Sequence, residues 1–242
     1  MKKTLIALTA IACFSSFAHA QTSGIYVGGQ LGSSILKASS LKDSYSYDDG
    51  YDYWSESYKI GSISDGKLAG SLNIGYNFKP AFDLPFRAEL SFTLRGNLDD
   101  KKHKSYYDED DDLYHTTQRT KARMNTLMLN GYYDIETGTS FTPFVGAGIG
   151  LAFAKLEHRY DERYEFDDEA DYIQFSRSKT KFAWNVAAGV AYKVSDNLDI
   201  DFTARYVDAG KLTLKRSYDD FHFKASGKLS SVDLLAGIRY NF

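Results

Sequence analysis

The chain ends in the stretch Val232–Phe242, which reads VDLLAGIRYNF. Counting back from Phe242, every second residue is apolar, whereas the positions between include Asp233, Arg239 and Asn241. Soluble strands also alternate, but they seldom stop on an exposed aromatic residue. A strand with lipid on its outer face and water on its inner face has this pattern. The stretch therefore predicts a membrane-spanning β-strand.

The start of the chain predicts export. Two lysines near the N-terminus precede an apolar run from Leu5 to Phe17, and Ala18-His19-Ala20 supplies small residues before a cleavage site. This arrangement is typical of a secretory signal peptide, which we place at residues 1–20. A lipoprotein signal at Cys13 is the alternative, but the residues before that cysteine match poorly and the apolar run would be very short.

The remaining residues, 21–242, have the size of one β-domain. They contain no cysteine, which suits an envelope protein without disulfides. Removal of Lys2 and Lys3 leaves 27 basic and 32 acidic residues, so the net charge of −5 gives no reason to expect nucleic acid. No later run of about 18 apolar residues predicts a spanning helix. The 19 Tyr, 16 Phe and 19 Gly against 3 Pro are typical of a membrane barrel.

Seven further segments repeat the alternation of the last one. An even number of strands with one polarity predicts an all-β fold, a closed eight-stranded antiparallel transmembrane β-barrel. Closure is required because an open edge in lipid leaves backbone groups unpaired. A soluble barrel such as a lipocalin is the alternative, and the glycines and paired charges on the second face favour the membrane. The segments are 25–32, 68–78, 86–95, 126–134, 145–153, 182–193 and 198–206.

The connections alternate in length. Short connections at 79–85, 136–140 and 195–197 alternate with long ones at 37–66, 96–121, 156–180 and 208–228. Short turns at one end and long loops at the other are typical of outer-membrane barrels, whose long loops lie outside the cell. Alternation at 211–215 indicates that some strands continue beyond the bilayer.

Four stretches resemble the opacity-type outer-membrane proteins: Tyr26–Gly32, Phe86–Leu90, Thr142–Gly150 and Ala236–Phe242. These proteins belong to a broad group of small eight-stranded barrels that includes the OmpA transmembrane domain. The resemblance covers the strands and not the long loops. It implies that the barrel-assembly machinery recognises the terminal pattern of Ile238, Tyr240 and Phe242. Proteins of this type are often named porins. The resemblance also implies that, as in several members, the loops bind host receptors or glycans.

All four long loops mix aromatic residues with carboxylates. Tyr and Trp give large, rigid contact areas, so the set predicts a recognition surface; solvated loop tips are the alternative for any single residue. The acidic runs 108–112 and 167–169 suggest Ca²⁺ binding or bridging of lipopolysaccharide, but they lack a calcium-loop pattern, which favours plain solvated charge. The recognition candidates are Tyr47, Tyr51, Tyr53, Trp54, Tyr106, Tyr107, Tyr160, Tyr164, Tyr218 and Phe221.

Charged residues recur on the inward faces of the strands. They either line a pore or form a salt-bridged plug. An eight-stranded barrel is just wide enough to be filled by its own side chains, so we expect a plug with small or gated conductance. Removal of one partner would leave a charge stranded in the interior. The residues are Arg87, Glu89, Arg95, Asp134, Asp199, Asp201, Arg205, Asp233 and Arg239.

No catalytic site is evident. His103, His115, His158 and His222 fall in hydrophilic loops, and no nucleophile has a plausible base, so we expect neither an enzyme nor a cofactor. We predict a monomeric outer-membrane barrel, in contact with lipid and lipopolysaccharide, whose surface loops mediate adhesion or host or ligand interaction. The competing prediction is a small porin or an envelope-integrity barrel with little or no binding role.

Overall fold

The computed structural model describes residues 24–48, 51, 53–107, 113–164, 171–218 and 221–242, so the predicted signal peptide lies outside the described residues. Within these ranges no helix is long and apolar enough to cross a membrane. The elements are β1 (Ile25–Asp48), β2 (Tyr53–Asn77), α2 (Lys79–Phe82), β3 (Phe86–Arg95), β4 (Leu98–Tyr107), β5 (Leu113–Asp134), β6 (Phe141–Tyr164), β7 (Asp171–Lys193), β8 (Leu198–Tyr218) and β9 (Phe221–Asn241).

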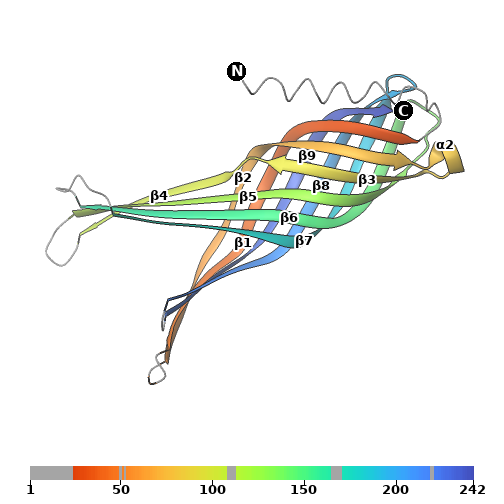
Figure 1. The fold of residues 1–242 in the computed structure, drawn as a ribbon. Coiled ribbons are helices and arrows are strands. Elements are labelled where there is room, and N and C mark those ends of the chain that lie inside the picture. The colour runs from red at the N-terminus through yellow and green to blue at the C-terminus, as the bar shows by residue number, and fades with distance from the viewer. Residues whose placement is uncertain (1–23, 49–50, 52, 108–112, 165–170, 219–220) are drawn as a thin grey trace, which may run out of the picture.

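The strands form one closed ring (Figure 1). Neighbours are antiparallel in the order β3-β2-β1-β9-β8-β7-β6-β5-β4, and β3 also pairs with β5 to close the sheet. β3 and β4 form one interrupted strand, because both pair with β5 and only Gly96 and Asn97 separate them. The predicted closed eight-stranded antiparallel barrel is confirmed.

The apolar face of each strand points outward. Leu68 and Leu72 are 75% and 70% exposed, whereas Ser71 between them is 3% exposed. The same contrast separates exposed Leu129 from buried Asn130 on β5. This orientation excludes the soluble alternative, because a lipocalin-like barrel would have its apolar face inside.

Glycines on the inner face of β6 allow the neighbouring strand β5 to approach closely. A Cβ on Gly148 would collide with the Leu129 carbonyl and with the Asn130 side chain. A Cβ on Gly150 would collide with the Leu127 carbonyl oxygen. The absence of a side chain at these positions therefore leaves room for the neighbouring groups in a narrow barrel.

The short connections lie at one end of the barrel, which we call the short-turn end. They are 78–85, 135–140 and 194–197. The first holds the helical turn α2, which the sequence analysis did not predict. Pro80 lies in its first turn, and Asp83 ends it in the left-handed conformation, with φ of 55°. The Lys79 ammonium pairs with Asp83 at 2.6 Å and with Glu136 at 2.7 Å, which joins this turn to the next.

At the opposite end, which we call the ribbon end, the long connections are mostly paired strand, as the alternation at 211–215 predicted for one of them. In their described parts, β1 and β2 pair as far as Asp48 and Tyr53, and β6 and β7 as far as Glu162 and Asp171. Both faces of these extensions carry many polar residues. Without a buried apolar face, the two-residue periodicity that marks a strand in the sequence is weak.

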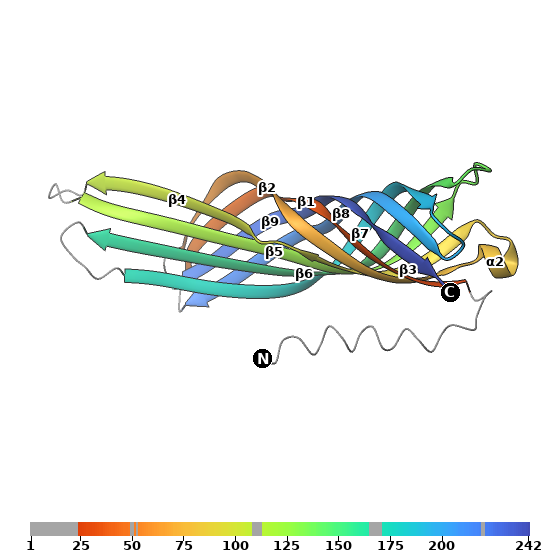
Figure 2. The same ribbon diagram turned by 90° about the horizontal axis from the view of Figure 1, so that it is seen from above.

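The ribbon end divides into two four-stranded sheets. Pairing between β7 and β8 stops at Trp184 and Asp208, and pairing between β2 and β3 stops at Ala69 and Arg95. Beyond these points β4, β5, β6 and β7 form one sheet, called here the β4–β7 sheet. β2, β1, β9 and β8 form the other, called here the β1–β9 sheet. Figure 1 shows the first extending to the left and the second downward, and Figure 2 shows the β4–β7 sheet from above.

Bulges explain why the two sheets diverge. The register shifts in β1 between Ala38 and Leu41, and in β8 between Asp208 and Lys211, where Gly210 has a φ of 67°. The pairings within the β4–β7 sheet show no such shift. A bulge bends its strand and increases the local twist. The β1–β9 sheet therefore bends away where it leaves the barrel.

Candidate functional site

The lumen near the short-turn end holds an arginine between aromatic rings. The Arg87 Nε atom donates to both carboxylate oxygens of Asp134, at 2.7 and 3.0 Å. Its guanidinium carbon lies 5.0 Å from the ring centres of both Tyr132 and Phe144. Stacking on two rings and pairing with a carboxylate replace the hydration that a buried guanidinium loses.

A second arginine lies beside the first. The Arg239 Nη2 atom is 3.0 Å from Asp199 and 3.4 Å from Asp201, and the guanidinium lies over the ring of Tyr26. The Tyr26 hydroxyl in turn donates to the Glu89 carboxylate at 3.1 Å. Tyr26 on β1 therefore links the charges on β3, β8 and β9 within this layer.

The middle of the lumen centres on Asp233. Its carboxylate receives two bonds from Arg95, Nη2 at 2.6 Å and Nε at 3.0 Å, and two from Arg205, Nη2 at 3.0 Å and Nε at 3.2 Å. The Ser34 hydroxyl donates to it at 2.6 Å. The Asp233 and Arg95 side chains are 0% exposed. One carboxylate thus joins β1, β3, β8 and β9 across the full width of the barrel.

The structure brings the nine predicted lumen charges together in three groups and one outlier. Glu89 is the outlier, because hydroxyl groups of Tyr26 and Tyr132 are its hydrogen-bond partners in the described lumen. Sequence reasoning missed those two tyrosines and Ser34, since partners across a barrel are not visible in a linear pattern. The groups are Arg87 with Asp134; Arg95 and Arg205 with Asp233; and Arg239 with Asp199 and Asp201.

Toward the ribbon end the lumen becomes apolar, which the pattern of inward charges did not predict. Inward side chains from both sheets pack together there, just below the point where the sheets diverge. Leu36, Leu98 and Met124 are at most 1% exposed. The cluster consists of Leu36, Ala38, Leu98, Ala122, Met124, Met128, Ala152, Ala154, Ala183, Val207, Ala209 and Leu229.

We expect the purified barrel to be electrically silent. A conducting lumen needs a continuous path of water, and the apolar cluster and the layer around Asp233 both fill the cross-section with side chains. Single-channel recording in planar bilayers measures this directly. Discrete conductance steps from the folded barrel would show that the plug opens, and would favour the porin prediction.

Aromatic recognition candidates come together at the tip of the β1–β9 sheet. Tyr47 pairs with Trp54 on β2 and with Phe221 on β9, and Phe221 pairs with Tyr218 on β8. Two predicted loops therefore contribute to one cross-strand row. Trp54 in this row is 49% exposed, and the nearby Tyr53 and Tyr51 are 73% and 96% exposed.

A second row lies at the tip of the β4–β7 sheet. Tyr114 pairs with Tyr106 on β4 and with Tyr164 on β6, while Tyr107 and Tyr160 pair with other residues of β5. Tyr114 is not among the predicted recognition residues, because only the strand register places it between Tyr106 and Tyr164. For Tyr106, Tyr107, Tyr160, Tyr164, Tyr218 and Phe221 the backbone is described, but their side chains lie outside the described residues, as do the acidic runs 108–112 and 167–169 and the side chains of the four loop histidines.

The predicted assembly residues lie on the last strand. Ile238 and Tyr240 are exposed on the outer face, and the Tyr240 and Phe242 rings meet edge to face at 5.1 Å. The Phe242 amide donates to the Ile25 carbonyl at 3.0 Å, next to the start of β1. Their recognition by assembly machinery stays a prediction.

Comparison with known proteins agrees with this architecture. The family described as "Outer membrane protein beta-barrel domain" matches residues 4–242. Outer membrane protein PagN of Salmonella typhimurium is 34% identical over 223 residues, which cover 90% of each chain. RC1281 of Rickettsia conorii, whose name gives it a proposed adhesin role, is 25% identical over 79% of this chain and 74% of its own. The crystal structure of Neisserial surface protein A has the same fold, with a TM-score of 0.50, 20% identity, and coverage of 91% of this chain and 98% of that one.

These matches confirm the predicted membership of the small opacity-type and OmpA-like barrels, and the predicted location. The chain belongs to the outer-membrane β-barrel protein family and is an integral protein of the outer membrane.

Proposed function

We propose that this barrel is a surface adhesin that binds its partner with the aromatic tips of the two sheets. The observation that carries the proposal is the register, which collects aromatic residues from separate connections into one row on each sheet. Clustered Tyr and Trp residues dominate the energetics of many interfaces. A paired ribbon also holds them with less loss of conformational entropy than a loop would.

The name of one relative also supports an adhesin role. RC1281, similar along most of its length, carries adhesion in its name. The lumen supports it indirectly, because side chains fill the interior and leave the ribbon end as the part available for partners. The proposed role needs no catalysis, and in the described part of the chain no three His, Cys, Asp or Glu side chains are grouped to hold a metal ion. We further propose a monomer with its ribbon end outside the cell.

Paired substitutions test the contribution of each tip. We expect Tyr47→Ala with Trp54→Ala to reduce adhesion at least about tenfold, because truncation of two hot-spot aromatics removes roughly 2 kcal/mol or more. The equivalent pair on the other sheet is Tyr106→Ala with Tyr114→Ala. Binding of cultured epithelial cells by a non-adherent bacterium displaying each variant is the measurement.

The matched control is the neighbouring cross-strand pair, Ser46→Ala with Ser55→Ala, which changes the same ribbon without removing an aromatic ring. Heat-modifiable gel migration establishes that each variant is folded. Adhesion that survives both aromatic double variants would contradict the proposal. So would a failure of binding to follow when the whole β1–β9 or β4–β7 sheet is grafted onto a related non-adherent barrel.

A further inference from the structure

Two cations lie directly opposite each other where the β4–β7 sheet extends beyond the lipid-facing apolar residues of the barrel. Arg123 on β5 and Lys155 on β6 are direct cross-strand partners, and both are exposed on the outer face. Like charges directly opposite each other destabilise a sheet. Arg123 donates to the neutral side chain of Asn97 at 2.6 Å, and Lys155 pairs with Glu157 at 2.5 Å. The pair therefore keeps an excess of positive charge.

The surrounding surface increases that excess. Lys121 lies opposite Glu157, and Arg119 is bonded to Asp99 at 2.7 Å. The hydrogen bond from Lys155 lowers the pKa of the Glu157 carboxyl, so Glu157 stays ionised and is still outnumbered. Among the described side chains on this patch the cations are Lys101, Arg119, Lys121, Arg123 and Lys155, and the anions are Asp99 and Glu157.

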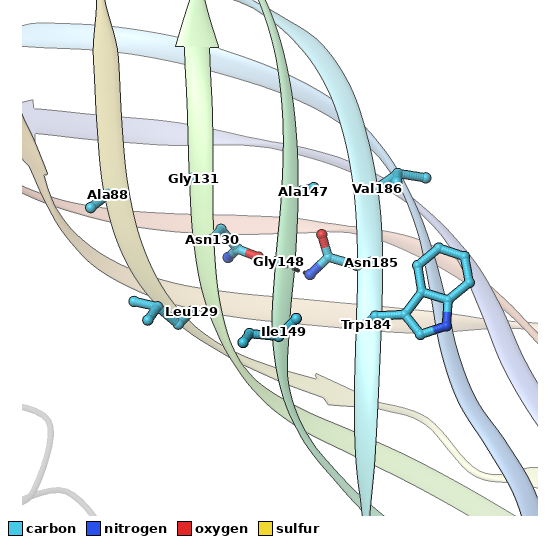
Figure 3. A pocket seen from close by; sticks show the side chains of 10 residues that line it. All are labelled: Ala88, Leu129, Asn130, Gly131, Ala147, Gly148, Ile149, Trp184, Asn185 and Val186. Atoms are coloured by element: carbon cyan, nitrogen blue, oxygen red, sulfur yellow. Dashed lines mark hydrogen bonds between the residues drawn. The ribbon is translucent and has the colours of Figure 1, made fainter.

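An apolar hollow of about 630 Å³ lies on the same wall, nearer the short-turn end. Leu129, Ile149 and Trp184 form one cross-strand row along it. The next row toward the short-turn end contains Gly131 and Ala147, whose small size forms the hollow (Figure 3). The wall faces lipid, so hydrocarbon is the available occupant.

The distance between the hollow and the cation pair along the membrane normal matches the hydrocarbon thickness of one lipid leaflet. Lys155 lies six positions after Ile149 on β6. At about 3.4 Å per residue this is roughly 20 Å along the strand, or about 15 Å along the membrane normal at a tilt of about 40°. Half of a hydrocarbon core about 30 Å thick is the same distance. The hollow therefore lies near the bilayer centre when the cation pair lies at the level of the headgroups.

We propose that this wall binds a phosphorylated lipid of the outer leaflet, with its phosphate between Arg123 and Lys155 and one acyl chain reaching the hollow beside Trp184. Charge complementarity favours a lipid phosphate over a second copy of this chain, which would bring the same cations face to face in any two-fold pairing through this wall. This site is separate from the aromatic tips and does not depend on the adhesin proposal.

Trp184 provides the reporter. The chain has two tryptophans, so Trp54→Phe leaves Trp184 as the single fluorophore. The folded barrel is placed in phosphatidylcholine nanodiscs that contain a small fraction of phosphatidic acid, brominated near the acyl terminus. We expect this lipid to quench Trp184 with an apparent affinity about tenfold higher than equally brominated phosphatidylcholine, since each cation near the surface contributes about 1 kcal/mol and Glu157 offsets part of it.

In the Trp54→Phe background, Arg123→Gln with Lys155→Gln is expected to abolish the preference for phosphatidic acid. The matched control is Lys211→Gln with Lys228→Gln, another exposed, directly opposed pair, on β8 and β9. It removes the same charge and should leave the preference intact. Equal loss in both variants would show general attraction to anionic lipid and overturn the site. Equal quenching by the two brominated lipids in the Trp54→Phe variant that retains Arg123 and Lys155 would overturn it as well.

Discussion

Asp233→Asn is expected to destabilise the folded barrel by about 3–5 kcal/mol. The substitution keeps the shape of the side chain but removes the charge that neutralises Arg95 and Arg205, and both guanidiniums would stay buried in the lumen. A buried charge without its partner loses hydration and gains nothing in return. Denaturant unfolding in detergent micelles, followed by the gel mobility of the folded form, measures the loss.

Two companion variants separate the network from a general effect of losing a carboxylate. Asp83→Asn removes the exposed pair with Lys79 in the α2 turn and should cause no measurable change. Replacement of the whole group, as Arg95→Met, Arg205→Met and Asp233→Leu, should restore most of the stability, because an apolar set of similar volume needs no charge compensation. An Asp233→Asn barrel as stable as the unsubstituted one would show that the two arginines find other partners.

Gly150→Val is expected to prevent formation of the folded barrel. A Cβ at this position would collide with the Leu127 carbonyl oxygen and would lie 2.8 Å from the Met128 Cα atom, so backbone would have to move in β5. Overpacking that side chains relieve costs about 1–3 kcal/mol, and a displaced strand in a closed ring costs more because its neighbours have to follow. The fraction of heat-modifiable protein after refolding is the measurement.

Gly131→Ala is the matched control for this prediction. Gly131 lies on the neighbouring strand β5 but faces outward, where an added Cβ meets no atom within 4 Å. Its folded fraction should equal that of the unsubstituted barrel. If Gly150→Val also folded normally, the space between Gly150 on β6 and Met128 on β5 would be wider than the structure indicates.

The strand positions could be read from the sequence because each spanning segment has one face in lipid. That constraint forces the alternation seen in Leu68–Phe78 or Val232–Phe242, and one misplaced residue would turn the whole strand over. The inward charges were visible for the same reason. Their pairing was not, since Arg95 and Asp233 are 138 residues apart and meet only when the ring closes.

Beyond the bilayer the sequence loses this signal. Both faces of the ribbons are open to water, so nothing forces the period of two, and apart from the alternation at 211–215 the paired strands looked like loops. The row that joins Tyr106, Tyr114 and Tyr164 depends on register, and register is a property of pairs of strands.

The sequence by itself therefore determined the compartment, the barrel and which face of each strand meets lipid, because those follow from local alternation along the chain. The tertiary structure alone decided that the ribbon end splits into two sheets, that an apolar cluster closes the lumen beneath the split, and which charges and aromatics are neighbours. These features depend on hydrogen bonds and contacts between distant strands, and no single stretch of sequence carries that information.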